Sequence, residues 1–270
     1  MDDPVEVEQP SVLLDVRLDG VAIVTLNRPG RHNAWNMEME RRYIDTLDEC
    51  DRREDVRVIV VTGAGRGFCA GADFDALQDT SANGADLPAD KPSGAAPLSI
   101  RKPMIAAING ACAGAGLIQA LMCDVRFVAA EARLTFAFTR LGLIAEYGVA
   151  WVLTRLVGTA TALDLLVSSR VFDGAEAARL GLASRALPAA HVLGEALEYA
   201  AYLATNCSPR AMAAIKSQVM AATTQDLQSA LLEADRLMTT YLAHPDFAEG
   251  VRSVVEKKPP RFEPVGRSVG

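Results

Sequence analysis

The residues of this sequence that could do chemistry lie mainly in two segments rich in glycine and alanine. The first is GAGRGFCAGAD at 63–73, and the second is NGACAGAG at 109–116. The common signatures G-x-S-x-G, H-E-x-x-H and G-x-x-x-x-G-K-[ST] are absent. A dinucleotide-binding turn is not expected at Gly63, Gly65 and Gly67 either, because the third glycine falls one place early and no helix is predicted after it.

Each of these segments follows a short apolar run, at 56–62 and 104–108, and leads toward a helix. Small residues let the backbone approach a ligand closely, and the first N–H groups of a helix have no partner inside the helix. Two such turns could direct two amide donors at one oxygen, as an oxyanion hole requires. Close packing of a helix on a strand also favours glycine and alanine, and these residues alone leave both interpretations open.

The elements that would position these turns indicate a layered α/β core. The repeated order of buried strand, glycine-rich turn and helix is typical of this class. A helical C-terminal part from residue 191 is expected, with breaks at Pro209 and at 244–245. The individual predictions are a hairpin of 12–17 and 21–26 around Asp19-Gly20, a helix over 38–52 capped by Asn36, a strand over 125–129, helices near 73–78 and 116–122, and a mobile surface loop over 79–97.

Composition excludes several classes of function. The 270 residues carry a net charge of −7, which does not favour a nucleic-acid partner. Five cysteines without a C-x-x-C pair and three scattered histidines give little basis for a zinc site or disulfides. The acidic N-terminus does not resemble a signal peptide, and we interpret the apolar stretch 104–123 as buried strand and helix. We expect a cytoplasmic protein with no membrane partner and no metal.

Five motifs resemble the enoyl-CoA hydratase/isomerase, or crotonase, superfamily. They are FCAGAD at 68–73, KPMIAAINGACAGAGLIQALMCD at 102–124, LNRPGRHNAWN at 26–36, GLIAEYGVAWVLTRLVG at 142–158 and RVFDGAEAARLGLASRAL at 170–187. The resemblance implies an α/β spiral of ββα units over residues 1–200 and a helical trimerisation region over 201–270. It also implies acyl-CoA or enoyl-CoA as the substrate, no separate cofactor, and a homotrimer or a dimer of trimers.

The resemblance also assigns roles to particular residues. The backbone N–H groups of Ala72 and Ala115 would be the oxyanion donors that polarise a thioester carbonyl and stabilise the enolate. Coenzyme A would contact Ala70 and Ala72, and its phosphates would meet cations. The candidate cations are Arg28 and Arg31, with Lys257 and Lys258 supplied by a neighbouring subunit, although each of these charges could equally be solvated surface. Asp73 and Asp124 match family positions too, and we interpret both as helix-start or turn residues.

The sequence departs from the hydratases of this superfamily at their two catalytic glutamates, which correspond here to Ile118 and Phe138. Neither side chain can carry a proton or orient a water. Glu146 remains, in the string LGLIAEYGVAW, and in several isomerases of the superfamily an acid at this position moves a proton along the acyl chain. Glu146 could instead only favour the first turn of a helix over about 147–156. We expect apolar surroundings for it from Phe138, Ile144, Tyr147 and Trp151.

Three hypotheses follow from these residues. The first is an isomerase that moves the double bond of an enoyl-CoA, with Glu146 as the proton shuttle. The second is a hydratase in which Glu146 alone activates water. The third is a non-catalytic acyl-CoA-binding protein that keeps the pocket without the chemistry.

Overall fold

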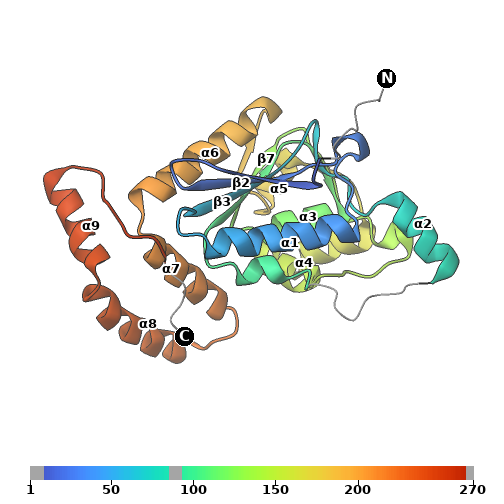
Figure 1. Ribbon diagram of the computed structural model, residues 1–270. Helices are drawn as coiled ribbons and strands as arrows, with labels where there is room; N and C mark the ends of the chain where they lie inside the picture. The colour runs from blue at the N-terminus through green and yellow to red at the C-terminus, as the bar shows by residue number, and fades with distance from the viewer. Residues whose placement is uncertain (1–8, 85–92, 266–270) are drawn as a thin grey trace, which may run out of the picture.

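The computed structural model describes residues 9–84 and 93–265, in which two sheets form the centre of the molecule (Figure 1). The larger sheet has the strand order β1-β2-β3-β5-β7-β10, and only its first pair is antiparallel. The smaller sheet has the order β4-β6-β8-β9, with β8 and β9 antiparallel. The strands are β1 (Val12–Val16), β2 (Val21–Leu26), β3 (Val58–Gly63), β4 (Gly67–Cys69), β5 (Met104–Ile108), β6 (Ala111–Ala113), β7 (Val125–Ala129), β8 (Arg133–Thr135), β9 (Phe172–Asp173) and β10 (Arg185–Leu187).

A repeated ββα unit builds these sheets. In each unit the first strand joins the larger sheet, the second joins the smaller sheet, and a helix follows. The three units end in α2 (Phe74–Asn83), α3 (Gly114–Leu121) and α4 (Val149–Ser168). Every residue of β3 and of β5 is buried, which explains why these strands are continuous apolar runs in the sequence. The predicted spiral of ββα units is therefore confirmed.

The N-terminal hairpin and the first helix also follow the prediction. In the turn between β1 and β2, Gly20 has φ +85°, and the Asp19 carboxylate accepts a hydrogen bond from Val21 N at 3.2 Å. Helix α1 (Met37–Arg52) begins where the Asn36 side chain accepts from Met39 N at 2.9 Å. Its buried face packs on β1 and β2, and α6 (Ala189–Asn206) packs on β3, β5 and β7.

Two local predictions were wrong. Helix α2 continues to Asn83, so residues 79–83 are helical rather than part of a loop. Of the rest of the predicted loop, residues 85–92 lie outside the described residues, and Ala96–Ser99 forms a 3-10 turn. Helix α4 starts at Val149 and runs to Ser168, well past 147–156, with a kink at Gly158. The stretch 104–123 folds into β5, β6 and buried α3, as predicted.

Helix α4 is the one described helix whose length and composition alone would let it cross a membrane. Its kink and its two charged residues, Arg155 and Asp164, interrupt that apolar character. Its first turn is anchored in the core by buried Val149 and Leu153.

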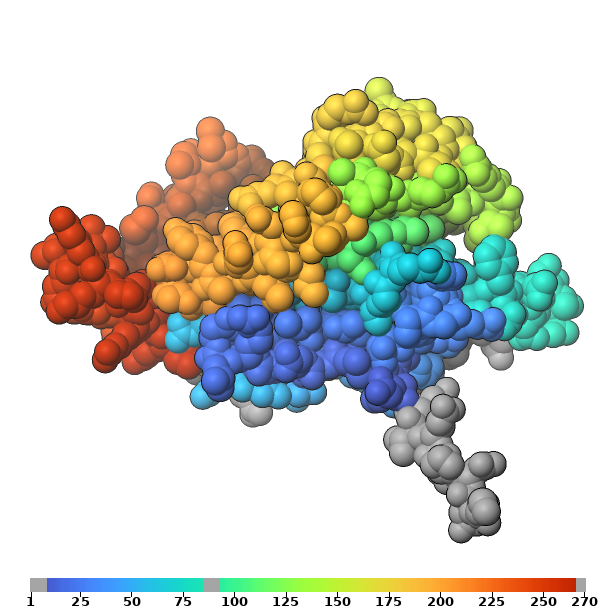
Figure 2. Space-filling model, turned by 90° about the horizontal axis from the view of Figure 1, so that it is seen from above, coloured from blue at the N-terminus to red at the C-terminus, as the bar shows by residue number. Residues whose placement is uncertain are grey.

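The C-terminal part is helical, with α5 (Gly174–Arg179) and α6 before it. It comprises α7 (Pro209–Ala221), α8 (Leu227–Leu242) and α9 (Pro245–Glu256), with breaks at the two predicted places. We call α7–α9 the C-terminal arm. The arm extends from the core at the end opposite α2, as Figures 1 and 2 show. The predicted domain boundary at residue 200 falls inside α6, and the division into two domains stays a prediction.

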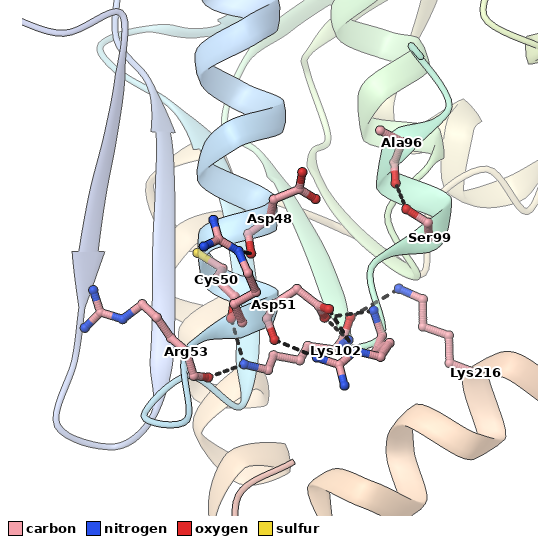
Figure 3. Close-up of polar contacts among 10 residues, drawn as sticks. Asp48, Cys50, Asp51, Arg53, Ala96, Ser99, Lys102 and Lys216 are labelled. Carbon is pink, nitrogen blue, oxygen red and sulfur yellow. Dashed lines mark hydrogen bonds and ion pairs between the residues drawn. The ribbon is translucent and has the colours of Figure 1, made fainter. Parts of the chain in front are cut away.

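A buried lysine joins α1 to the arm (Figure 3). Lys102 is 2% exposed, and its ammonium donates to the carbonyls of Cys50, at 2.7 Å, and of Arg53, at the end of α1. The Lys102 carbonyl in turn accepts from Lys216 of α7 at 3.2 Å. Lys216 also pairs with Asp124 at 2.8 Å, so the arm is held to the core by a polar network.

Candidate active site

The two glycine-rich turns lie against each other. Gly71 has φ +90°, and a Cβ on it would come within 3.1 Å of the carbonyl oxygen of Ala113. Gly114, with φ +45°, faces Gly71 across the same contact. These left-handed conformations and the missing side chains allow the turn after β4 to meet the turn into α3. The chain therefore brings the segments of Ala72 and Ala115 together.

The backbone around Ala72 is fixed by Trp35. The N–H of Trp35 donates to the Gly71 carbonyl at 2.7 Å, and the N–H of Asp73 donates to the Trp35 carbonyl at 2.9 Å. These bonds flank Ala72 and leave its own N–H outside the bridge. Ala115 is the second residue of α3, where N–H groups have no partner inside the helix. Neither amide is taken up by the Trp35 bridge or by the hydrogen bonds inside α3.

Asn33 connects this region to the strands. It is buried with φ +55°, and its amide nitrogen donates to the carbonyls of Ala64, Gly67 and Phe68 at 2.9–3.1 Å. Its side-chain oxygen accepts from Arg28 N at 2.9 Å. The sequence analysis missed this role, although an asparagine between a predicted strand and a predicted helix cap is a recognisable turn signal.

The glycines of these turns allow close packing at several places, and the oxyanion hole stays a prediction. A Cβ on Gly116 would lie 2.4 Å from the Cβ of Cys69, so this glycine serves the packing of α3 on β4. Gly71 and Gly114 serve the contact between the turns. Residues 67–69 form a strand, so the prediction that no helix directly follows Gly63, Gly65 and Gly67 is confirmed.

Glu146 lies in the segment that leads into α4, and it is exposed in the single chain. The apolar surroundings predicted for it are wrong in three respects. Phe138 is buried and stacks on Phe136 in the core, Ile144 is 84% exposed, and Trp151 is 37% exposed. The 3-10 turn Thr139–Leu141 and Gly142 separate buried Phe138 from exposed Ile144 along the chain. Ile118, at the other hydratase position, is also buried.

The neighbouring Tyr147 links Glu146 to the rest of the site. Its hydroxyl donates to the carboxylate of Glu40 on α1 at 3.2 Å. Burial and the negative charges of Glu40 and Glu146 raise the pKa of Tyr147, whereas the nearby indole N–H of Trp35 lowers it. Glu146 thus directly precedes a half-buried tyrosine that is bonded to α1. In the sequence, Glu40 falls in the apolar stripe of α1 with Tyr43 and Leu47. That position was the signal that could have revealed the pairing of Glu40 with Tyr147.

The candidate phosphate-binding arginines are largely engaged with acids. Arg28 pairs with Asp73 at 2.9 Å and donates to the carbonyl of Ala34. Arg31 is 54% exposed and pairs with Asp75. A surface pocket of about 630 Å³ opens beside them; its lining includes Arg28, Arg31, Arg42 and Glu38. Each of these arginines pairs with an acid, so an anion would have to compete with those ion pairs, and Arg31 is more exposed than Arg28.

The remaining predicted contacts are placed as follows. Ala70 is exposed, with its N–H bonded to the His32 carbonyl at 3.0 Å. Lys257 and Lys258 are exposed after α9, and Lys258 pairs with Glu256. Because α9 lies at the opposite end of the molecule from α2, a single chain does not bring Lys257 to Arg31 (Figure 2).

The two aspartates have the structural roles that were predicted. Asp73 caps α2 by accepting from Asp75 N at 3.2 Å. Asp124 accepts from Met104 N at 2.7 Å and pairs with Lys216. Among residues 9–84 and 93–265, no three His, Cys, Asp or Glu side chains gather closely enough to hold a metal ion.

A spiral of ββα units in which two glycine-rich turns adjoin defines a protein of the crotonase fold. A family model for enoyl-CoA hydratase/isomerase matches residues 17–265. A protein of Rhodobacter capsulatus described as a probable enoyl-CoA hydratase is 37% identical over 90% of this chain and 95% of its own length. The 1,2-epoxyphenylacetyl-CoA isomerase of Escherichia coli is 34% identical over 90% of this chain and 95% of its own.

Solved structures agree with these relatives. The crystal structure of a probable enoyl-CoA hydratase/isomerase from Mycobacterium abscessus superposes with a TM-score of 0.88 at 36% identity, covering 95% of this chain and 99% of that one. The chain belongs to the enoyl-CoA hydratase/isomerase family.

Proposed function

We propose that this protein is an enzyme that moves the double bond of an enoyl-CoA through an enolate held by two backbone amides. The observation that carries the proposal is the contact between the turns of Ala72 and Ala115, with Trp35 hydrogen-bonded on both sides of Ala72. The carboxylate is assigned to Glu146 from the family resemblance, and its neighbour Tyr147 is bonded to Glu40 of α1. The similarity to an isomerase of a CoA thioester supports this choice.

The reaction needs only one proton carrier. In a 3-enoyl-CoA, the thioester and the neighbouring double bond both acidify the protons on C2. The Glu146 carboxylate removes one of them, and the N–H groups of Ala72 and Ala115 donate to the oxygen of the resulting dienolate. The same carboxyl group then returns the proton to C4, which gives the conjugated 2-enoyl-CoA and restores the carboxylate. Atoms and charge balance without any other reactant.

Glu146 is exposed in the single chain, and the proposal requires that it lose water when substrate binds or subunits assemble. A general acid and base near neutral pH works best in a partly desolvated place. Leu143 and Ile144, which precede Glu146, are exposed apolar side chains. A bound acyl chain or a neighbouring subunit that covers them would also remove water from Glu146.

The second candidate is hydration of a 2-enoyl-CoA by water that Glu146 alone activates. The printed descriptions of several relatives as enoyl-CoA hydratases favour it. The residues at the two glutamate positions of the usual hydratases argue against hydration. They are Ile118 and Phe138, which are both apolar and buried. The third candidate, a binder without turnover, rests on the same two residues, and Glu146 opposes it.

The proposal extends to the ligand and the assembly. Ala70, Ala72 and Arg31 would contact coenzyme A, with Lys257 from a neighbouring subunit of a homotrimer or a dimer of trimers. We propose no cofactor beyond the coenzyme A of the substrate, and a soluble, cytoplasmic protein without nucleic-acid or membrane partners. Light scattering should give three or six times the chain mass of 28.8 kDa, and a stable monomer would contradict the assembly.

The test is to incubate the purified protein with a 3-enoyl-CoA and, separately, with a 2-enoyl-CoA, and to identify the products by mass spectrometry and NMR. A shift of the double bond from the first substrate is the expected result. Formation of a 3-hydroxyacyl-CoA from the second, without the shift, would establish the hydratase instead. Binding of both without turnover would overturn both enzymatic assignments.

A further inference from the structure

The segment that carries Glu146 is bounded by two glycines. Gly142 and Gly148 are both in the left-handed region, with φ +68° and +72°. Ile144 and Glu146 within the segment are exposed, whereas Tyr147 is half-buried. Because glycines at both ends allow several backbone conformations, contacts of the Tyr147 side chain help to set the position of the segment.

Tyr147 makes those contacts. Its ring covers Gly94 so closely that a Cβ there would lie 1.5 Å from the ring carbon Cδ1. Its hydroxyl reaches the Glu40 carboxylate, and Glu40 is only 2% exposed. In this position Tyr147 has φ +53°, which is unfavourable for a bulky side chain. Backbone strain of this kind persists where surrounding contacts over-determine it, and it concentrates at functional sites.

We propose that Glu40 and Tyr147 are positioning residues that fix the carboxylate of Glu146 against the substrate, and we call the pair the Glu40–Tyr147 latch. The inference rests on the proposed function, because it assumes that Glu146 transfers the proton. The latch ties the catalytic segment to α1, whose N-terminal end follows directly after Trp35. The backbone of Ala72 is bonded to Trp35, and Tyr147, next to Glu146, is bonded to Glu40. Both are therefore held by the short stretch of chain from Trp35 to Glu40 at the start of α1.

A tyrosine hydroxyl is protonated through the neutral range, so that of Tyr147 remains a donor to Glu40. Misplacing a reacting group by about 1 Å costs on the order of 100-fold in rate, so loss of the latch should appear in turnover. Substrate affinity should change little, because coenzyme A and the acyl chain supply most of the contacts.

The experiment compares Tyr147→Phe with Tyr43→Phe. Each removes one hydroxyl from a tyrosine packed in or against the core, but the hydroxyl of buried Tyr43 has no hydrogen-bond partner in the described part of the chain. We expect Tyr147→Phe to lower kcat at least about tenfold with KM within about threefold, a loss consistent with misplacement. Tyr43→Phe should stay within about twofold of the wild type. Equal kcat in the two variants would overturn the latch.

A second pair keeps the inference testable if Tyr147→Phe fails to fold. Glu40→Gln retains an oxygen that accepts from Tyr147, whereas Glu40→Leu does not. We expect the glutamine variant to keep most of kcat and the leucine variant to match Tyr147→Phe, with thermal unfolding recorded for each. Equal rates in the two Glu40 variants would contradict the latch. Glu146→Gln separates the failures: if it is inactive while Tyr147→Phe is normal, only the latch is wrong, and if it is fully active, the proposed function is wrong.

Discussion

At the scale of single residues, the proposed chemistry rests mostly on backbone atoms. The N–H groups of Ala72 and Ala115 need no particular side chain, so residue types alone could not identify them. What the sequence could indicate was the small size of the residues around them, and Gly71 and Gly114 explain why that size is needed. Trp35, which fixes Ala72, was not predicted, because its role comes from backbone bonds between segments 36 residues apart.

Removing one amide donor tests this assignment. Proline at position 115 lacks the N–H, and the first turn of a helix tolerates proline because no intrahelical bond is lost there. We expect Ala115→Pro to lower kcat by about 100- to 1,000-fold, as loss of one oxyanion donor does. Ala115→Ser keeps the amide and should remain within a few-fold of the wild type. The assignment fails if a folded proline variant, checked by circular dichroism, is as active as the serine variant.

At the scale of elements, most strands and helices could be predicted, because their signals are local. The buried run of β3, the turn at Asp19-Gly20 and the cap Asn36 each act within a few residues. The end of α2 could not be predicted, since Asp79, Ser81 and Asn83 are typical of loops yet lie on an exposed helix. The burial of Lys102 was missed for a different reason. A lysine that caps a helix distant in sequence leaves no local pattern.

Lys102 should give the stability of α1 a dependence on pH. Burial lowers the pKa of Lys102 to about 8. The unfolded chain, with an ordinary lysine pKa of about 10.4, therefore binds more protons between these values, so stability should rise with pH across this window. The rise is at most about 3 kcal/mol for a shift of this size.

Lys102→Met removes the titrating group and the two donors to the end of α1. Urea unfolding from pH 7 to 10 should show the wild type gaining stability relative to this variant as the pH rises above about 8. Lys216→Met, which changes a lysine of the same network but leaves the Lys102 ammonium in place, is the control and should keep the wild-type slope. Parallel curves for the wild type and Lys102→Met would show that the ammonium does not titrate in this range.

At the scale of the whole molecule, the family resemblance gave the spiral, but not how the catalytic segment is held. Glu40 and Tyr147 are 107 residues apart, and their hydrogen bond depends on how α1 and the start of α4 pack. The C-terminal arm leaves apolar side chains of α8 and α9 exposed, around a groove of about 610 Å³ lined by residues that include Leu242, Phe247 and Val251. This surface supports the proposed trimer, in which a neighbouring copy would cover it.

The central claim is that one carboxylate, at Glu146, moves the proton while two amides hold the oxygen. Its most direct test is the rate at which Glu146→Gln converts a 3-enoyl-CoA, measured beside its affinity for the same thioester by calorimetry. Glutamine keeps the size of the side chain and loses only the proton carrier. The account predicts loss of turnover with affinity unchanged within a few-fold. A glutamine variant that isomerises the substrate at the wild-type rate would contradict it.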